Sequence, residues 1–209
     1  ERLSTLYRLP QCQNGLIFAP LGTLLQRLAP PSYIARYAFV MQTGEKFSLH
    51  KMREQFTKVG YRQAEQVFLP GEFAVRGGIF DVYPMGSARP LRLDLFDDQI
   101  ESIYYFDPET QRSVDKVTSI EILPAHEFPL DEAGVMQFRQ AFRENFAINP
   151  ALSPIYQAVS DYQAPAGIEY YLPLFFEQAA HFFDYLPAQT CIVSDAHLHT
   201  LAEKAWEEI

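Results

Sequence analysis

The sequence lacks the features that would place the chain in a membrane or in a disulfide framework. No stretch of 18 apolar residues occurs, and no charged and then apolar leader opens the chain. The two cysteines, Cys12 and Cys191, lie far apart and have no paired spacing. We therefore expect a reduced, cytoplasmic protein that makes no contact with a membrane. Because the chain starts at Glu1 rather than Met, we expect it to be part of a longer protein.

Common catalytic and cofactor motifs are also missing. There is no G-x-x-x-x-G-K-[ST] phosphate loop, no G-x-G-x-x-G turn and no H-E-x-x-H zinc motif. The one glycine pair, Gly77-Gly78, interrupts a strand pattern, which is more typical of a bulge or a tight bend than of a phosphate cradle. His197 and His199 are two residues apart, and helical ligands need a spacing of three or four. We expect no cofactor, no metal and no catalytic residue in this chain.

Positive charge is scarce in the last third of the chain. The net charge is −9, and residues 125–209 carry three basic against 12 acidic side chains, whereas residues 35–124 carry 11 against 13. A phosphate backbone requires clustered Lys and Arg, so neither segment predicts a strong independent nucleic-acid site. Folding could still gather scattered basic residues into a patch.

The patterns that are present divide the chain into three units. Residues 1–33 suggest a helix, a short apolar strand at 16–19 and a second helix, which is typical of part of an α/β domain. Residues 34–124 suggest a compact α+β unit. Residues 125–209 return to a helical and α/β pattern.

The middle unit combines one helix with several hairpins. After a strand at 38–41, a helix is predicted to begin after Ser48, which can cap it, and to end at Gly60. The remaining segments alternate apolar and polar residues between Gly, Pro and Asp turns, as in "FAVRGGIFDVYP" and "IESIYYFDPETQRSV". This pattern predicts an antiparallel sheet.

The third unit contains two predicted helices and a strand. Asp131 can cap a helix with a buried stripe, "TCIVSD" at 190–195 predicts a buried strand, and a final helix follows it. The predicted buried stripes consist of Val135, Phe138, Phe142 and Phe146 in the first helix, and of Leu198, Leu201, Ala205 and Ile209 in the last.

One predicted strand, "LRLDLF" at 91–96, carries an unexplained aromatic residue. Three leucines recur with a period of two, so Arg92, Asp94 and Phe96 share the opposite face. A solvated strand face gains nothing from a large aromatic side chain. Either Phe96 is an interface residue, or it packs against a neighbouring hairpin while Arg92 and Asp94 pair on the surface.

Several segments resemble the N-terminal region of the bacterial transcription-repair coupling factors (Mfd), which is homologous to the excision-repair protein UvrB. They are "RLSTLYRLP", "GEFAVRGGIFDVYPMGS", "LRLDLFDDQIESIYYFDPETQRS", "ILPAHEFP", "PAGIEYYLPLFFE" and "FDYLPAQTCIVSDAHL". The resemblance implies an α/β fold, in which a degenerate helicase-like domain similar to UvrB domain 1 is split by an inserted α+β domain with an antiparallel sheet. It implies that this inserted domain binds the damage-recognition ATPase UvrA.

The resemblance also bears on catalysis. Where UvrB-type ATPases end a strand in D-E-S-H, this sequence has Asp195-Ala196-His197-Leu198. The glutamate that orients the attacking water is replaced by a methyl group, which implies a degenerate ATPase motif at Asp195 and Ala196.

Carried over position by position, the resemblance assigns UvrA binding to Arg76, Arg92, Asp94 and Phe96. It implies a non-catalytic, monomeric module that recruits UvrA to stalled RNA polymerase for nucleotide excision repair. The parent would then contact RNA polymerase and DNA through other domains, and would be a DNA-dependent ATPase and translocase through C-terminal domains. The alternative is a fragment of a UvrB-type damage-loading ATPase that itself contacts DNA.

Overall fold

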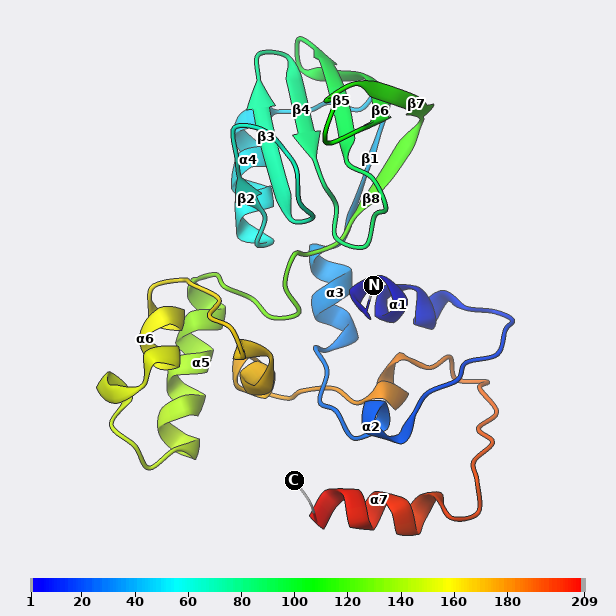
Figure 1. The fold of residues 1–209 in the computed structure, drawn as a ribbon, viewed down its shortest axis with the longest axis vertical. Coiled ribbons are helices and arrows are strands. Elements are labelled where there is room, and N and C mark those ends of the chain that lie inside the picture. Colours follow the sequence, from blue (N-terminus) through cyan, green and yellow to red (C-terminus); the bar gives the residue numbers. More distant parts are fainter. Residues whose placement is uncertain (1, 208–209) are drawn as a thin grey trace.

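The computed structural model describes residues 2–207, which form helices and two sheets (Figure 1). The α-helices are α1 (Arg2–Arg8), α2 (Leu21–Leu24), α3 (Pro31–Tyr37), α4 (Leu49–Lys58), α5 (Glu132–Asn145), α6 (Pro154–Ser160) and α7 (Leu198–Glu207). The 3-10 helices are η1 (Leu9–Gln11), η2 (Pro150–Leu152), η3 (Ile168–Phe175) and η4 (Phe182–Tyr185). The strands are β1 (Phe39–Gln42), β2 (Arg62–Gln63), β3 (Glu72–Arg76), β4 (Ile79–Val82), β5 (Leu91–Phe96), β6 (Gln99–Phe106), β7 (Ser113–Val117) and β8 (Ser119–Ile122).

The larger sheet is a meander in the order β2-β3-β4-β5-β6-β7. Only the short β2–β3 pair is parallel; the other neighbours are antiparallel, as the turn signals predicted. A second, two-stranded sheet pairs β1 with β8, so the two ends of this unit lie side by side. In Figure 1 both sheets form the upper part of the molecule, with α4 beside β2 and β3.

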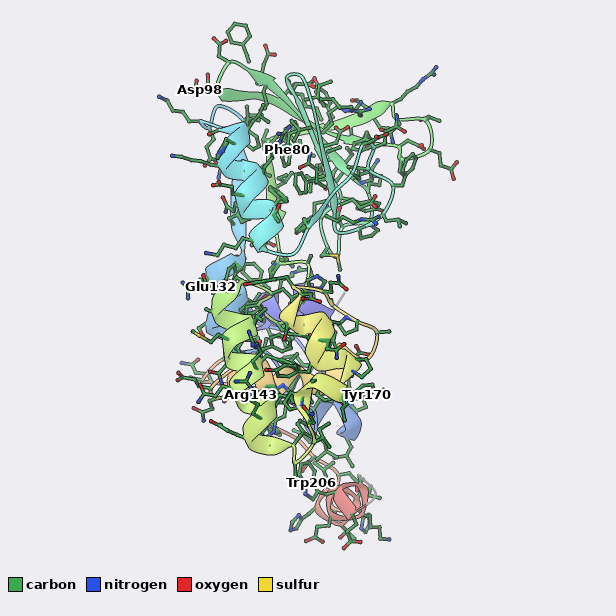
Figure 2. All side chains as sticks on the ribbon, turned by 90° about the vertical axis from the view of Figure 1, so that its left-hand side faces the viewer. Phe80, Asp98, Glu132, Arg143, Tyr170 and Trp206 are labelled. Atoms are coloured by element: carbon green, nitrogen blue, oxygen red, sulfur yellow. The ribbon has the colours of Figure 1, made fainter. Side chains whose placement is uncertain are left out.

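Helix α4 covers one face of the larger sheet and forms the main core with it. Phe56 of α4 is fully buried against Phe73 and Phe80, whose ring centroids lie 5.6 and 5.0 Å from its own. Figure 2 shows Phe80 in this interior. The helix begins after Ser48 and is followed by Gly60 at φ +91°, the left-handed conformation that terminates helices, so the predicted boundaries are confirmed. The Ser48 side chain makes no capping hydrogen bond, contrary to the prediction.

The helical part of the molecule has two further cores. One joins α1 and α3 to η4 from far along the sequence, through side chains such as Leu6, Ile34 and Tyr185. The other packs α5 against α6 and η3. As predicted, the side chain of Asp131 caps α5 by accepting from the Gly134 amide at 3.0 Å, and Phe138 and Phe142 are buried. Phe146 follows the helix and is 37% exposed.

Two predicted strands do not form. Residues 16–19 and 190–195 are coil, and their large side chains are exposed, Phe18 at 89% and Val193 at 92%. An apolar run becomes a strand only when a neighbouring strand satisfies its backbone, and no described strand lies beside either segment.

Helix α7 forms where it was predicted but packs against nothing described. None of its residues is buried, and Leu201 of the predicted stripe is 51% exposed. Ile209, the last member of that stripe, lies outside the described residues. Figure 2 shows Trp206 of α7 at one end of the molecule and Asp98, in the β5–β6 turn, near the other.

Candidate functional site

The face of the larger sheet that points away from α4 gathers the residues singled out in the sequence. Strand alternation sends Phe80 and Val82 of β4 into the core and Asp81 to the opposite side. The register sets Ala74, Asp81, Arg92 and Tyr104 opposite one another across four strands. We call this surface the outer face and define it by the side chains of Arg76, Asp81, Arg92, Asp94 and Phe96.

Asp81 is the centre of an ion-pair network on the outer face. Its carboxylate is fully buried and accepts from Nε and Nη2 of Arg92 at 2.7 and 2.9 Å. Nη2 of Arg76 donates to the same carboxylate at 2.6 Å. Removing a carboxylate from water is costly unless it is paired and hydrogen-bonded, and two guanidinium groups meet that need here. A single carboxylate therefore pairs with two guanidinium groups.

Arg92 is held by several partners within its own domain. Its side chain is only 12% exposed, it donates from Nη1 to the Gln111 carbonyl at 2.9 Å, and its guanidinium carbon lies 4.7 Å from the Phe106 ring centroid. The hydrogen bond to Asp81 raises the pKa of Arg92 against the opposing effect of burial. The surface pairing of Arg92 with Asp94 considered from the sequence is wrong, because Arg92 pairs with Asp81.

Asp94 lies beside this network on β5 and is partly exposed. Its Oδ2 atom accepts from the Ser102 hydroxyl of β6 at 3.2 Å. Asp94 therefore adds a partly exposed carboxylate to the outer face.

Phe96 is exposed, which answers the question that the sequence raised. Its side chain is 68% exposed at the end of β5, where a two-residue turn with Asp97 at φ +51° leads into β6. It is not tucked against a neighbouring hairpin, so that alternative is wrong. Arg76 also ends its strand, and its side chain is 40% exposed.

The hairpin that carries Arg76 and the hairpin that carries Phe96 are fixed to each other. The Leu95 amide donates to the Gly78 carbonyl at 2.7 Å, and a Cβ on Gly78 would lie 3.1 Å from the Leu95 carbonyl oxygen. Gly77 turns the chain at φ +59°. The glycine pair therefore forms a tight hairpin turn, as predicted. The end of β3 that carries Arg76 and the end of β5 that carries Phe96 thus lie at the same end of the sheet.

Asp81 and Gln111 were missed by the sequence analysis. Asp81 interrupts the apolar residues of "IFDV", but only the strand register shows that it faces Arg92. Gln111 has φ +59° in the β6–β7 connection, and its Nε2 donates to the Pro108 carbonyl at 2.7 Å. Its position depends on loop geometry, which the sequence did not indicate.

Asp195 and Ala196 lie apart from the outer face, in an exposed loop before α7. The Asp195 carboxylate accepts from the His197 amide at 2.8 Å. Within residues 2–207, no three His, Cys, Asp or Glu side chains are grouped so that they could hold a metal ion. No helix in the same range is long and apolar enough to cross a membrane.

Comparison with known proteins identifies the domain that carries the outer face. Residues 39–128 match the model of the UvrB interaction domain. The whole chain is 46% identical to part of the transcription-repair-coupling factor of Haemophilus influenzae, and 98% of it is 46% identical to part of that of Escherichia coli. The chain belongs to the transcription-repair-coupling-factor family. The Bacillus subtilis member is 29% identical over all of it.

The matched region covers only part of a coupling factor. The chain spans 18% of the length of the Haemophilus influenzae and Escherichia coli relatives and 19% of the Bacillus subtilis one. The UvrB interaction domain takes in β1 to β8 and α4, and so it contains every residue of the outer face. Asp195 and Ala196 fall outside it.

Proposed function

We propose that the outer face of the UvrB interaction domain binds UvrA, and that the chain is the UvrA-recruiting module of a coupling factor. The observation that carries this proposal is the exposure of Phe96, whose side chain is 68% exposed at the same end of the outer face as Arg76, which is 40% exposed. Aromatic and Arg side chains are the residues most enriched at interface hot spots. The two form a pair that a partner can cover together.

Charge supports an acidic counterpart on UvrA. Arg76 is the more exposed of the two guanidinium groups that share Asp81, so an acidic side chain of UvrA can reach it, although the nearby Asp94 balances the charge of the face as a whole. Arg92 then acts as a positioning residue, because it holds the Asp81 carboxylate to which Arg76 is bound. Asp94 adds a hydrogen-bond acceptor at the rim.

The same proposal makes the chain non-catalytic. Ala196 has no carboxylate that could orient a water molecule, and Asp195 lies in an exposed loop. In the parent, the module would bring UvrA to stalled RNA polymerase for nucleotide excision repair. Contacts with RNA polymerase and DNA, and an ATP-driven translocase activity, would then belong to other domains of the parent.

We further propose that residues 1–33 and 125–209 form one degenerate UvrB-like domain, into which residues 34–124 are inserted. In support, Leu28 pairs with Ala180 as an isolated antiparallel bridge, with N···O distances of 2.8 Å in both directions. The Tyr185 hydroxyl also donates to the Ala29 carbonyl. Two distant parts of the chain thus share one core beside the sheet unit.

Replacing Arg76 by Ala tests the charge in this proposal. The substitution removes the exposed cation but leaves Asp81 paired with Arg92, so we expect the fold to persist. It should slow association of the 209-residue chain with UvrA and flatten the salt dependence of the association rate. Stopped-flow mixing over a range of salt concentrations measures both effects.

The matched control is Arg89→Ala. Arg89 lies in the same domain, is 45% exposed and also pairs with an aspartate, Asp115. An Arg76→Ala variant that associates with UvrA as fast as the wild type, with an unchanged salt dependence, would remove Arg76 from the interface.

A further inference from the structure

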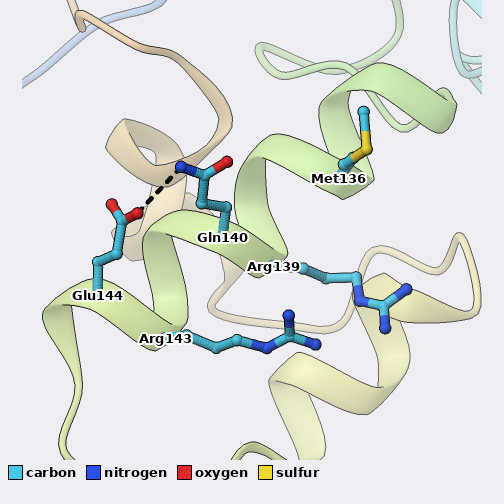
Figure 3. A pocket seen from close by; sticks show the side chains of 5 residues that line it. All are labelled: Met136, Arg139, Gln140, Arg143 and Glu144. Atoms are coloured by element: carbon cyan, nitrogen blue, oxygen red, sulfur yellow. Dashed lines mark hydrogen bonds between the residues drawn. The ribbon is translucent and has the colours of Figure 1, made fainter.

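A cationic surface lies on α5, far from the outer face. Arg139 and Arg143 are one helical turn apart, and both extend from α5 toward α6 (Figure 3). Their guanidinium carbons lie 5.9 and 5.6 Å from the ring centroid of the buried Tyr156 of α6, and Arg139 Nε donates to the Tyr156 hydroxyl at 3.2 Å. We call the surface formed by Arg139, Arg143 and Tyr156 the arginine groove.

Neither arginine is neutralised by an acidic side chain. Among residues 2–207, no carboxylate lies within ion-pair distance of either guanidinium group. Glu144, on the same helix, accepts from the Gln140 amide at 3.0 Å and makes no ion pair with either arginine (Figure 3). This is unexpected, because the last third of the chain has 12 acidic side chains and only three basic ones, two of which are these arginines. N–H groups of both guanidinium groups are therefore available to hydrogen-bond a ligand.

Two hollows adjoin the arginine groove, and apolar side chains line them. Adjoining hollows of about 360 and 630 Å³ share both arginines. Met136 lines the first and is 67% exposed; Pro150 and Ala151 line the second, next to Leu152, which is 80% exposed. Tyr156 lines the second hollow, and both guanidinium groups lie over its ring. Cations that are already oriented lose less entropy when a ligand binds.

We propose that the arginine groove docks a segment of a partner protein in which acidic and apolar residues are mixed. A carboxylate of the segment would bind the two guanidinium forks, and an apolar neighbour would pack on Met136 or Leu152. The surrounding charge favours this ligand over a nucleic acid. Glu144 and Asp161 line the hollows themselves, and a continuous phosphate backbone would have to pass them, whereas a peptide can direct single carboxylates to the arginines.

The test uses the 209-residue chain and two fluorescent probes: a short peptide of alternating Glu and Leu, and a single-stranded oligodeoxythymidine. The key variant is Arg139→Gln with Arg143→Gln, because Gln keeps the helix propensity and removes the charge. We expect it to weaken peptide binding about tenfold or more, as loss of paired Arg contacts to carboxylates does. The variant Arg139→Lys with Arg143→Lys keeps both positive charges but lacks the planar guanidinium groups. We expect it to bind the peptide more tightly than the double Gln variant and more weakly than the wild type.

Arg36→Gln is the matched control. Arg36 is a helical arginine too, with its guanidinium carbon 5.7 Å from the Tyr37 ring centroid, and its loss should leave peptide binding unchanged. Thermal melting verifies that each variant is folded. The proposal is overturned if the wild type does not bind the peptide, if the double Gln variant binds it equally well, or if the oligodeoxythymidine is the tighter ligand and depends on the two arginines. The UvrA titrations do not involve these residues, so the two proposals can fail independently.

Discussion

Asp81 ties the stability of the UvrB interaction domain to its proposed binding surface. Removing Arg92 would leave the buried carboxylate with Arg76 alone, and breaking a buried pair of this kind typically costs about 3–5 kcal/mol. We therefore expect Arg92→Ala to lower the free energy of unfolding by about 3 kcal/mol, less if Arg76 or water compensates. Urea unfolding measures this change.

The comparison for Arg92 is Arg89→Ala in the same domain. Arg89 and Asp115 are 45% and 59% exposed, and such surface pairs contribute about 0–1 kcal/mol. Equal destabilisation by the two variants would show that the Asp81 network is not the structural centre that its burial indicates. The same result would make any weaker UvrA binding of Arg92→Ala a direct effect.

At the residue scale, the sequence predicted which side chains share the outer face but not their partners. Period-two alternation is local, so it placed Arg92, Asp94 and Phe96 together and left open what each contacts. The contact of Arg92 with Asp81 depends on the register of β4 against β5, which the turn at 83–90 determines. The exposure of Phe96 likewise depends on the end of a hairpin, where no neighbour covers it.

At the element scale, prediction succeeded where a segment carries its own start and stop signals. Helix α5 has Asp131 as a capping side chain, α4 ends before Gly60 in a left-handed conformation, and the hairpins have Gly-Gly and Asp-Asp turns. Residues 16–19 and 190–195 have only apolar character. Strand formation there depends on a pairing partner, which a local pattern does not reveal.

At the scale of the whole molecule, a short connection after β8 joins the sheet unit to the helical part. The Val59 carbonyl accepts from the Ala125 amide at 2.8 Å, and the Tyr33 hydroxyl donates to the His126 carbonyl at 3.2 Å. The His126 ring lies against Gly60, where a Cβ would approach it to 2.5 Å, and stacks on Phe128 at 5.3 Å between centroids. His126 is therefore packed at the junction of the two parts.

This packing predicts a pH dependence of stability. Burial lowers the pKa of His126 from its ordinary value of 6.5, because the charged ring loses its hydration. Below pH 6.5 the unfolded chain binds the proton more readily than the folded one, so the stabilisation is complete above 6.5 and is lost as the pH falls toward the lowered pKa. We expect His126→Gln to reduce the loss of melting temperature between neutral and mildly acidic pH.

The control for His126 is His50→Gln on α4, where the side chain is 82% exposed. That variant should keep the pH dependence of the wild type. An unchanged dependence in His126→Gln would mean that protonation of this ring does not oppose folding.

The decisive variant for UvrA binding by the outer face of the UvrB interaction domain is Phe96→Ala. The ring is 68% exposed, so its removal should leave the melting temperature unchanged. Losing a hot-spot anchor should cost about 2 kcal/mol of binding free energy, roughly thirtyfold in affinity, mainly through faster dissociation. Titration of UvrA with this variant and with Phe18→Ala, which truncates a ring that is 89% exposed outside the domain, measures the difference. We expect weaker binding for Phe96→Ala alone; equal affinities of the two variants and the wild type would show that UvrA does not bind this face.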